Sequence, residues 1–80
     1  MAASLEELYE VLASALNAWN VQFRPEMGAR DVPGWDSMHH MMLILEVNDR
    51  FGVDLSPEAT AELPDIAALL AAIQAAQQGA

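Results

Sequence analysis

The chain has 80 residues, no cysteine, and a formal net charge of −9 from 12 acidic residues against three basic ones. A chain this short forms one domain, residues 1–80, whose small core leaves little room for a deep active-site cleft. The lack of cysteine excludes a disulfide framework and a thiolate metal site, and the negative charge disfavours nucleic acid and anionic membranes as partners.

No apolar run reaches the ~18 residues that a membrane-spanning helix needs. The N-terminal residues show no basic stretch followed by an apolar one, as a signal peptide would. We therefore expect a cytoplasmic, monomeric protein that works away from membranes.

The first predicted helix begins at a capping box, in which Ser4 caps the first turn and Glu7 returns to the cap backbone. Large apolar residues then recur every three or four positions: Leu5, Leu8, Leu12, Leu16 and Trp19. This spacing predicts a helix with one buried stripe that ends near Trp19.

Residues 20–36 form a long connection, because its prolines and glycines exclude a continuous helix. Its apolar residues are expected to hold it across the helices: Val21, Phe23, Met27 and Val32. We expect Trp35 to anchor the end of the loop, since a large aromatic side chain seldom stays exposed in a small domain. A loop this long in a small domain is typical of a functional segment.

A second helix is predicted from Ser37 to about Phe51, with Asp36 as its N-cap and Gly52 at its end. It is apolar on two sides. One is a predicted core stripe of Leu43, Ile44, Val47 and Phe51; the other is a sector of Met38, Met41, Met42 and Leu45. Such a helix either lies centrally or offers one sector to a partner.

The sequence Ser56-Pro57-Glu58 is typical of a helix start and predicts a short helix over residues 57–62. The last helix is predicted to start at residues 64–65 and to fray from Gln74 onward. Its expected inner stripe is Ile66, Leu69, Leu70 and Ile73. The predicted fold class is all-α: a bundle of four helices, the third short, with a long loop between the first two.

The tripeptide Asp36-Ser37-Met38 resembles the Asp-Ser-Leu signature of acyl carrier proteins. Gly34 precedes it at the spacing common in that family, and Phe51-Gly52-Val53 is similar to the family's segment at the end of the second helix. The resemblance covers nearly the whole chain. It implies the four-helix carrier fold, with the third helix short.

The resemblance also implies a non-catalytic function. Ser37 would carry covalent 4′-phosphopantetheine, attached from coenzyme A by a phosphopantetheinyl transferase that Asp36 contacts. A loading ligase or transferase would place an acyl or aminoacyl group on the thiol as a thioester, and downstream synthases or tailoring enzymes would receive it.

Met38 replaces the family's leucine, and the front of the second helix lacks the acids that face the partners of fatty-acid carriers. We predict a partner face that is more apolar: Met38, His39, Met41, Met42 and Leu45. Methionine adapts its shape and suits such surfaces. We therefore favour a discrete carrier of polyketide or nonribosomal peptide assembly over one for fatty-acid synthesis.

Other interpretations remain open at this point. The chain is alternatively a small helical protein–protein interaction module without a cofactor. Copper(I) binding by the methionine–histidine cluster is disfavoured, because adjacent helical residues diverge. Nucleophilic catalysis by Ser37 is disfavoured too, since no acid is placed to orient His39 or His40. His40 is expected to be solvated, or else to face the phosphate of an arm on Ser37.

Overall fold

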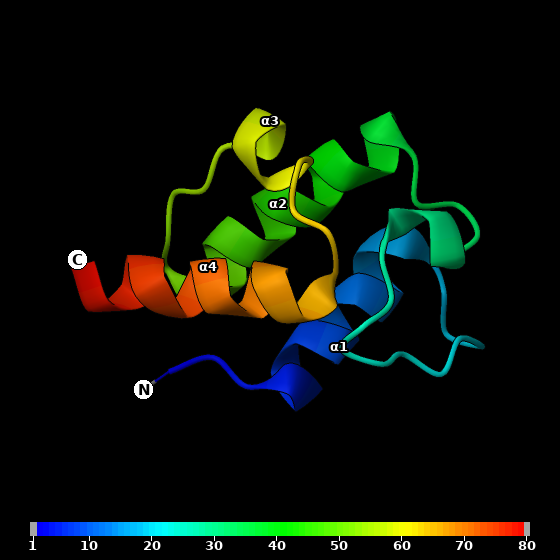
Figure 1. Ribbon diagram of the computed structural model, residues 1–80, viewed down its shortest axis with the longest axis horizontal. Helices are drawn as coiled ribbons and strands as arrows, with labels where there is room; N and C mark the ends of the chain where they lie inside the picture. The colour runs from blue at the N-terminus through cyan, green and yellow to red at the C-terminus, as the bar shows by residue number, and fades with distance from the viewer. Residues whose placement is uncertain (1, 80) are drawn as a thin grey trace.

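The computed structural model of the protein describes residues 2–79 and contains no strand in that range (Figure 1). Its four helices are α1 (Leu5–Leu16), α2 (Ser37–Phe51), α3 (Pro57–Thr60) and α4 (Ile66–Gly79), and the 3₁₀ segment η1 (Ala29–Asp31) lies between α1 and α2. The predicted all-helical bundle with a short third helix is confirmed. None of the helices described over residues 2–79 is long and apolar enough to cross a membrane.

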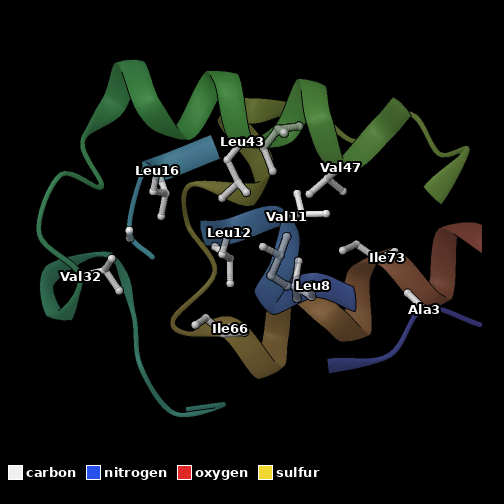
Figure 2. Packing of buried hydrophobic residues seen from close by; sticks show 13 residues of the cluster. Ala3, Leu8, Val11, Leu12, Leu16, Val32, Leu43, Val47, Ile66 and Ile73 are labelled. Carbon is white, nitrogen blue, oxygen red and sulfur yellow. The ribbon is translucent and has the colours of Figure 1, made fainter. Parts of the chain in front are cut away.

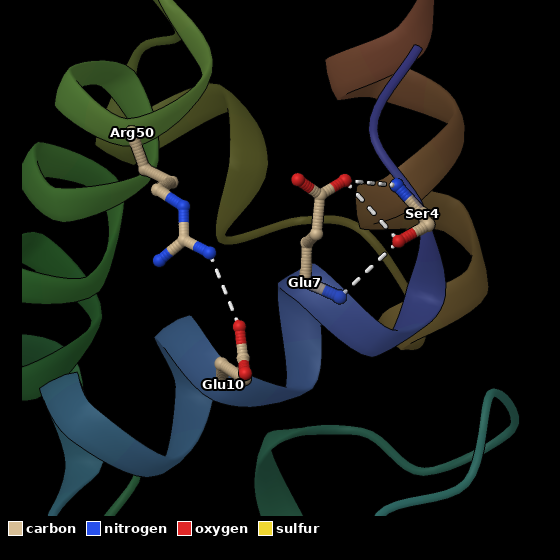
Figure 3. Close-up of polar contacts among 4 residues, drawn as sticks. All are labelled: Ser4, Glu7, Glu10 and Arg50. Carbon is tan, nitrogen blue, oxygen red and sulfur yellow. Dashed lines mark hydrogen bonds and ion pairs between the residues drawn. The ribbon is translucent and has the colours of Figure 1, made fainter. Parts of the chain in front are cut away.

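Helix α1 begins with the predicted capping box (Figure 3). The Ser4 hydroxyl accepts from the Glu7 amide at 3.3 Å, and the Glu7 carboxylate accepts from the Ser4 amide at 3.1 Å. The helix ends at Leu16 because Asn17 adopts the left-handed conformation (φ 52°, ψ 44°), which asparagine tolerates. Trp19 therefore lies outside the helix and is 67% exposed, so its predicted place in the buried stripe is wrong.

The loop between α1 and α2 is held against the bundle by side chains and by backbone. Four apolar side chains are buried or pack against the core, as predicted: Val21, Phe23, Met27 and Val32. The Met27 carbonyl accepts from the Ile66 amide at 2.9 Å, and the Pro25 carbonyl accepts from the Ala67 amide at 2.8 Å. The loop thereby supplies acceptors for the first amides of α4, which have no partner within their own helix.

The hydrophobic core is formed mainly by α1, α2 and α4 (Figure 2). Its largest fully buried side chains are Leu8, Val11, Leu12, Leu43, Ile44, Val47, Ile66 and Ile73. Phe51 and Leu70, also predicted for the core, are only partly buried. An ion pair of 3.1 Å between Arg50 and Glu10 joins α2 to α1 at the surface (Figure 3). Such exposed pairs contribute about 0–1 kcal/mol, so apolar burial holds these helices together.

Two residues define the link from α2 to α3. Gly52 ends α2 in the left-handed conformation (φ 66°), as predicted. The Asn48 side-chain amide donates to the Leu55 carbonyl at 3.1 Å and accepts from the Leu55 amide at 2.9 Å. Ser56 then caps α3, which ends at Thr60 and is shorter than predicted. The link thus carries α3 back toward α2.

Helix α4 continues to Gly79, so the predicted fraying from Gln74 is wrong as far as that residue; Ala80 lies outside the described residues. The Gln74 side chain donates to the Ala3 carbonyl at 2.8 Å, and the Gln77 side chain accepts from the Ala3 amide at 2.9 Å. These bonds join the segment before α1 to the end of α4. The polar residues of the last turns are therefore used in tertiary contacts.

Candidate functional site

Ser37 is the first residue of α2, and its side chain is exposed. Asp36 is the predicted N-cap: Oδ1 accepts from the His39 amide at 2.8 Å, and its carbonyl accepts from the His40 amide at 2.8 Å. The amides of Ser37 and Met38 have no acceptor within the helix, because they belong to its first turn. Free N–H groups and the positive end of the helix dipole therefore lie next to an accessible hydroxyl.

The Asp36 carboxylate also binds the His39 ring, with 2.7 Å between Oδ1 and Nδ1. The hydrogen bonds from the His39 amide and then from its ring lower the pKa of Asp36 below its ordinary value. The expectation that no acid orients either histidine is wrong for His39. An N-cap side chain and the residue three positions later lie on the same side of the first turn, which brings the two together.

The histidine rings near Ser37 form hydrogen bonds with groups other than its hydroxyl. Nδ1 of His39 contacts Asp36, and the two ring nitrogens of His40 contact Trp35 and Thr60. Within residues 2–79, no hydrogen bond joins the Ser37 hydroxyl to a base, as nucleophilic catalysis would require. The same residues contain no cluster of three histidine, aspartate or glutamate side chains suited to a metal ion.

His40 is half-buried, so the prediction of a solvated histidine is wrong. Its Nδ1 accepts from the Trp35 indole N–H at 3.1 Å, and its Nε2 lies 2.9 Å from Oγ1 of Thr60. The Trp35 and His40 rings are stacked, with centroids 6.2 Å apart and planes 15° apart. Burial lowers the pKa of His40, against an opposing effect of the Pro57 backbone. The predicted anchoring role of Trp35 is confirmed, because it packs against the core and bonds to α2.

A shallow cleft lies beside Ser37, between the loop, α2 and the region of α3. Its loop side has a volume of about 240 Å³ and is lined by Ala29, Trp35, Asp36, Ser37, His40 and Ala61. Its α3 side has a volume of about 200 Å³ and is lined by Ser37, His40, Met41, Pro57, Glu58 and Ala61. Behind His40, a cavity of only about 30 Å³ reaches Leu69 of α4. Ser37 and His40 thus line both of these hollows, which we call together the cleft.

Four large apolar side chains of α2 are exposed by 71, 53, 52 and 63%: Met38, Met41, Met42 and Leu45. We call these four residues the methionine stripe. Their spacing places them on one face of α2, away from the face that carries the buried core residues. A contiguous exposed apolar patch indicates an interaction site. His39, predicted for the same face, is half-buried and its ring binds Asp36.

Thr60 is a buried residue of this site that the sequence analysis does not single out. Its hydroxyl donates to the carbonyl of Ser56 at 2.8 Å or to that of Pro57 at 3.1 Å. The same oxygen lies 2.9 Å from Nε2 of His40. A threonine within a short helix carries no sequence signal for such a role. Only the packing of α3 against α2 brings Thr60 to His40, across 20 positions of the chain.

Comparison of the chain with models of protein families, with curated proteins and with solved structures finds no significant match. The chemistry of the site is therefore inferred from its own residues.

Proposed function

We propose that the protein is an acyl carrier protein of the four-helix type, and that Ser37 carries a covalent 4′-phosphopantetheine arm. The observation that supports this most directly is the exposed hydroxyl on the first turn of α2, next to the Asp36 cap and at the edge of a cleft. The resemblance of Asp36-Ser37-Met38 and Phe51-Gly52-Val53 to the family's motifs agrees with it. The arm would present a thiol that holds an acyl or aminoacyl group as a thioester.

The residues around Ser37 fit a phosphodiester at the rim of the cleft. The free amides of the first turn and the positive end of α2 favour a negative group there. The carboxylates of Asp36 and Glu58 oppose it, and no lysine or arginine lines either side of the cleft. Solvent screens this repulsion best at the exposed edge, so we place the phosphate there and not on the cleft floor.

The covalent step needs an external enzyme. A phosphopantetheinyl transferase with Mg²⁺ would join the Ser37 oxygen to the phosphopantetheine phosphorus of coenzyme A. The bond to the nucleotide would break, adenosine 3′,5′-bisphosphate would leave, and the hydroxyl proton would pass to a base of the transferase or to solvent. The carrier itself supplies a held, accessible nucleophile and the contact surface around Asp36.

The methionine stripe supports the assignment of the partner face. It runs along α2 from the residue next to Ser37, so a partner that docks there has the arm beside its own active site. Acidic residues appear only farther along the helix, at Glu46 and Asp49. We therefore propose partners with an apolar docking surface: loading ligases or transferases and downstream synthases or tailoring enzymes of polyketide or nonribosomal peptide assembly.

The decisive experiment measures the intact mass after incubation with coenzyme A, Mg²⁺ and a promiscuous phosphopantetheinyl transferase. We expect a gain of one arm in the parent protein and in Ser14→Ala, which lacks a different exposed hydroxyl. We expect no gain in Ser37→Ala. Absence of any gain, while a known carrier is modified in the same reaction, would refute the proposed function.

A second candidate function is a cofactor-free interaction module that binds a partner helix through the methionine stripe. The exposure of four large apolar side chains on one face favours it. The two functions differ in their dependence on Ser37. If the protein is an interaction module, the parent protein and Ser37→Ala bind the partner equally well. The mass of the module also does not change in the transferase reaction.

A further inference from the structure

Three separate segments meet at the His40 side chain: the end of the long loop through Trp35, helix α2 through His40 itself, and α3 through Thr60. We call these residues the Trp35–His40–Thr60 triad. The imidazole uses both of its nitrogens in these contacts, and it stacks on the indole as well. Trp35 and His40 line the cleft that Ser37 also borders, and all three residues of the triad line the small cavity behind His40.

The donors and acceptors of the triad allow only one protonation state. The indole N–H of Trp35 only donates, so Nδ1 of His40 must be the acceptor of the 3.1 Å bond. The single ring proton therefore lies on Nε2 and is donated to Oγ1 of Thr60, at 2.9 Å. The Thr60 hydroxyl passes its own proton to carbonyls at the start of α3. The bond from Trp35 requires a neutral imidazole, because it needs an unprotonated Nδ1, whereas the bond from Nε2–H to Thr60 forms in both protonation states.

We propose that the triad is a pH-sensitive switch, in which protonation of His40 releases Trp35 beside Ser37 while His40 stays bonded to Thr60. An imidazolium carries a proton on both nitrogens. Its Nδ1–H would point at the indole N–H, so the bond between them is replaced by a contact of two donors. The Nε2–H bond to Thr60 is kept, so the loop is released from His40 while α3 stays bonded to α2.

The charges around His40 affect how readily its imidazole is protonated. Three carboxylates border the same hollows as His40: Asp36 from the cap of α2, Glu58 from α3 and Asp65 from the segment before α4. None of them forms an ion pair with His40 within residues 2–79. They favour the imidazolium through longer-range attraction, whereas burial and the indole donor favour the neutral ring.

The sign of the pH dependence follows from burial. The pKa of His40 is lowered in the folded protein relative to the ordinary value of about 6.5. Between the two values the unfolded chain binds the proton more readily, so stability rises with pH in that window. The triad's contribution to stability is complete above about pH 6.5 and is lost as the pH falls through the lowered pKa.

A consequence for Ser37 rests on the proposed function, whereas the switch itself does not. Trp35, His40 and Ser37 line the same side of the cleft, so the release of Trp35 changes the space beside an attached arm. Acidification would then alter how the arm lies against the bundle.

The test is an NMR titration of the unmodified protein from pH 8 to pH 5, which does not depend on any reaction at Ser37. We expect the His40 ring to titrate below the ordinary histidine value and the Trp35 indole proton to move upfield with the same midpoint. The exposed indole of Trp19 is the internal reference and should not follow it. The switch is overturned if His40 titrates at or above the ordinary value, or if the Trp35 signal is constant across the titration of His40.

Variants distinguish the switch from a nonspecific effect of low pH on the whole protein. His40→Gln retains a donor and an acceptor but does not titrate, so the pH-dependent movement of the Trp35 indole should vanish. His39→Gln is the matched control on the neighbouring residue and should retain it. If His40→Gln does not fold, Trp35→Phe decides: loss of the indole donor should raise the pKa of His40, and an unchanged or lower pKa contradicts the proposal.

Discussion

One carboxylate oxygen of Asp36 accepts two hydrogen bonds from His39, at 2.8 Å from its amide and at 2.7 Å from Nδ1 of its ring. The same group therefore caps α2 and orients the neighbouring imidazole next to Ser37. Both bonds favour the ionised carboxylate, which is why the pKa of Asp36 is lowered.

We predict that Asp36→Ala destabilises the protein, whereas Asp36→Asn largely preserves stability because asparagine is also a good N-cap. A carboxyl group with a lowered folded pKa contributes stability that is present above its unfolded pKa, near 3.9, and lost as the pH falls through the folded value. Urea unfolding between pH 3 and pH 6 should show a weaker acid-side decline in Asp36→Asn than in the parent. Identical profiles would contradict the predicted role.

A second prediction compares two leucines on α2. Leu43 is fully buried and Leu45 is 63% exposed. Leu43→Ala should cost about 2–5 kcal/mol of unfolding free energy, because it leaves a cavity in the core. Leu45→Ala, the matched control, should change it by less than about 0.5 kcal/mol. The total free energy of unfolding of a domain of this size is roughly 4–12 kcal/mol, so Leu43→Ala should be clearly less stable in chemical denaturation. Equal effects would mean that the two faces of α2 are wrongly assigned.

The third prediction tests the methionine stripe. Met42 is 52% exposed, so Met42→Glu should leave the midpoint of thermal unfolding nearly unchanged. The new charge on an apolar docking face should weaken transfer of the cargo to a cognate enzyme, while attachment of the arm to Ser37 continues. Ala71→Glu, a similar change at an exposed position of α4, is the control and should not impair transfer. Unfolding of Met42→Glu would show that this side chain belongs to the core.

The fourth prediction joins the proposed arm to the triad. His40 lies three positions after Ser37 and borders the same cleft. A phosphodiester on Ser37 would add negative charge there and raise the pKa of His40, because an opposite charge favours the imidazolium. Histidine titration by NMR before and after modification measures this shift, with Ser37→Ala taken through the same reaction as the control. An unchanged or lower pKa in the modified protein would count against it.

Local signals in the sequence were sufficient for the number of helices and for the helix ends that a cap or a glycine defines. The capping box of Ser4 and Glu7, the Asp36 cap and the Gly52 end all appear as predicted, because each depends on residues within one turn. The apolar spacing of α2 likewise separated buried Leu43 from exposed Leu45, although it left open whether the second apolar sector was also covered within the bundle.

Only the tertiary structure decided how distant segments use their polar and aromatic residues. Gly28 shows why: a Cβ there would lie 2.6 Å from the Pro64 carbonyl, a contact that no local pattern indicates. The same holds for the bonds of Gln74 and Gln77 to Ala3, and for the triad around His40. Sequence spacing determines which face of a helix is apolar, whereas a hydrogen bond between residues 20 or 71 positions apart exists only once the helices have packed.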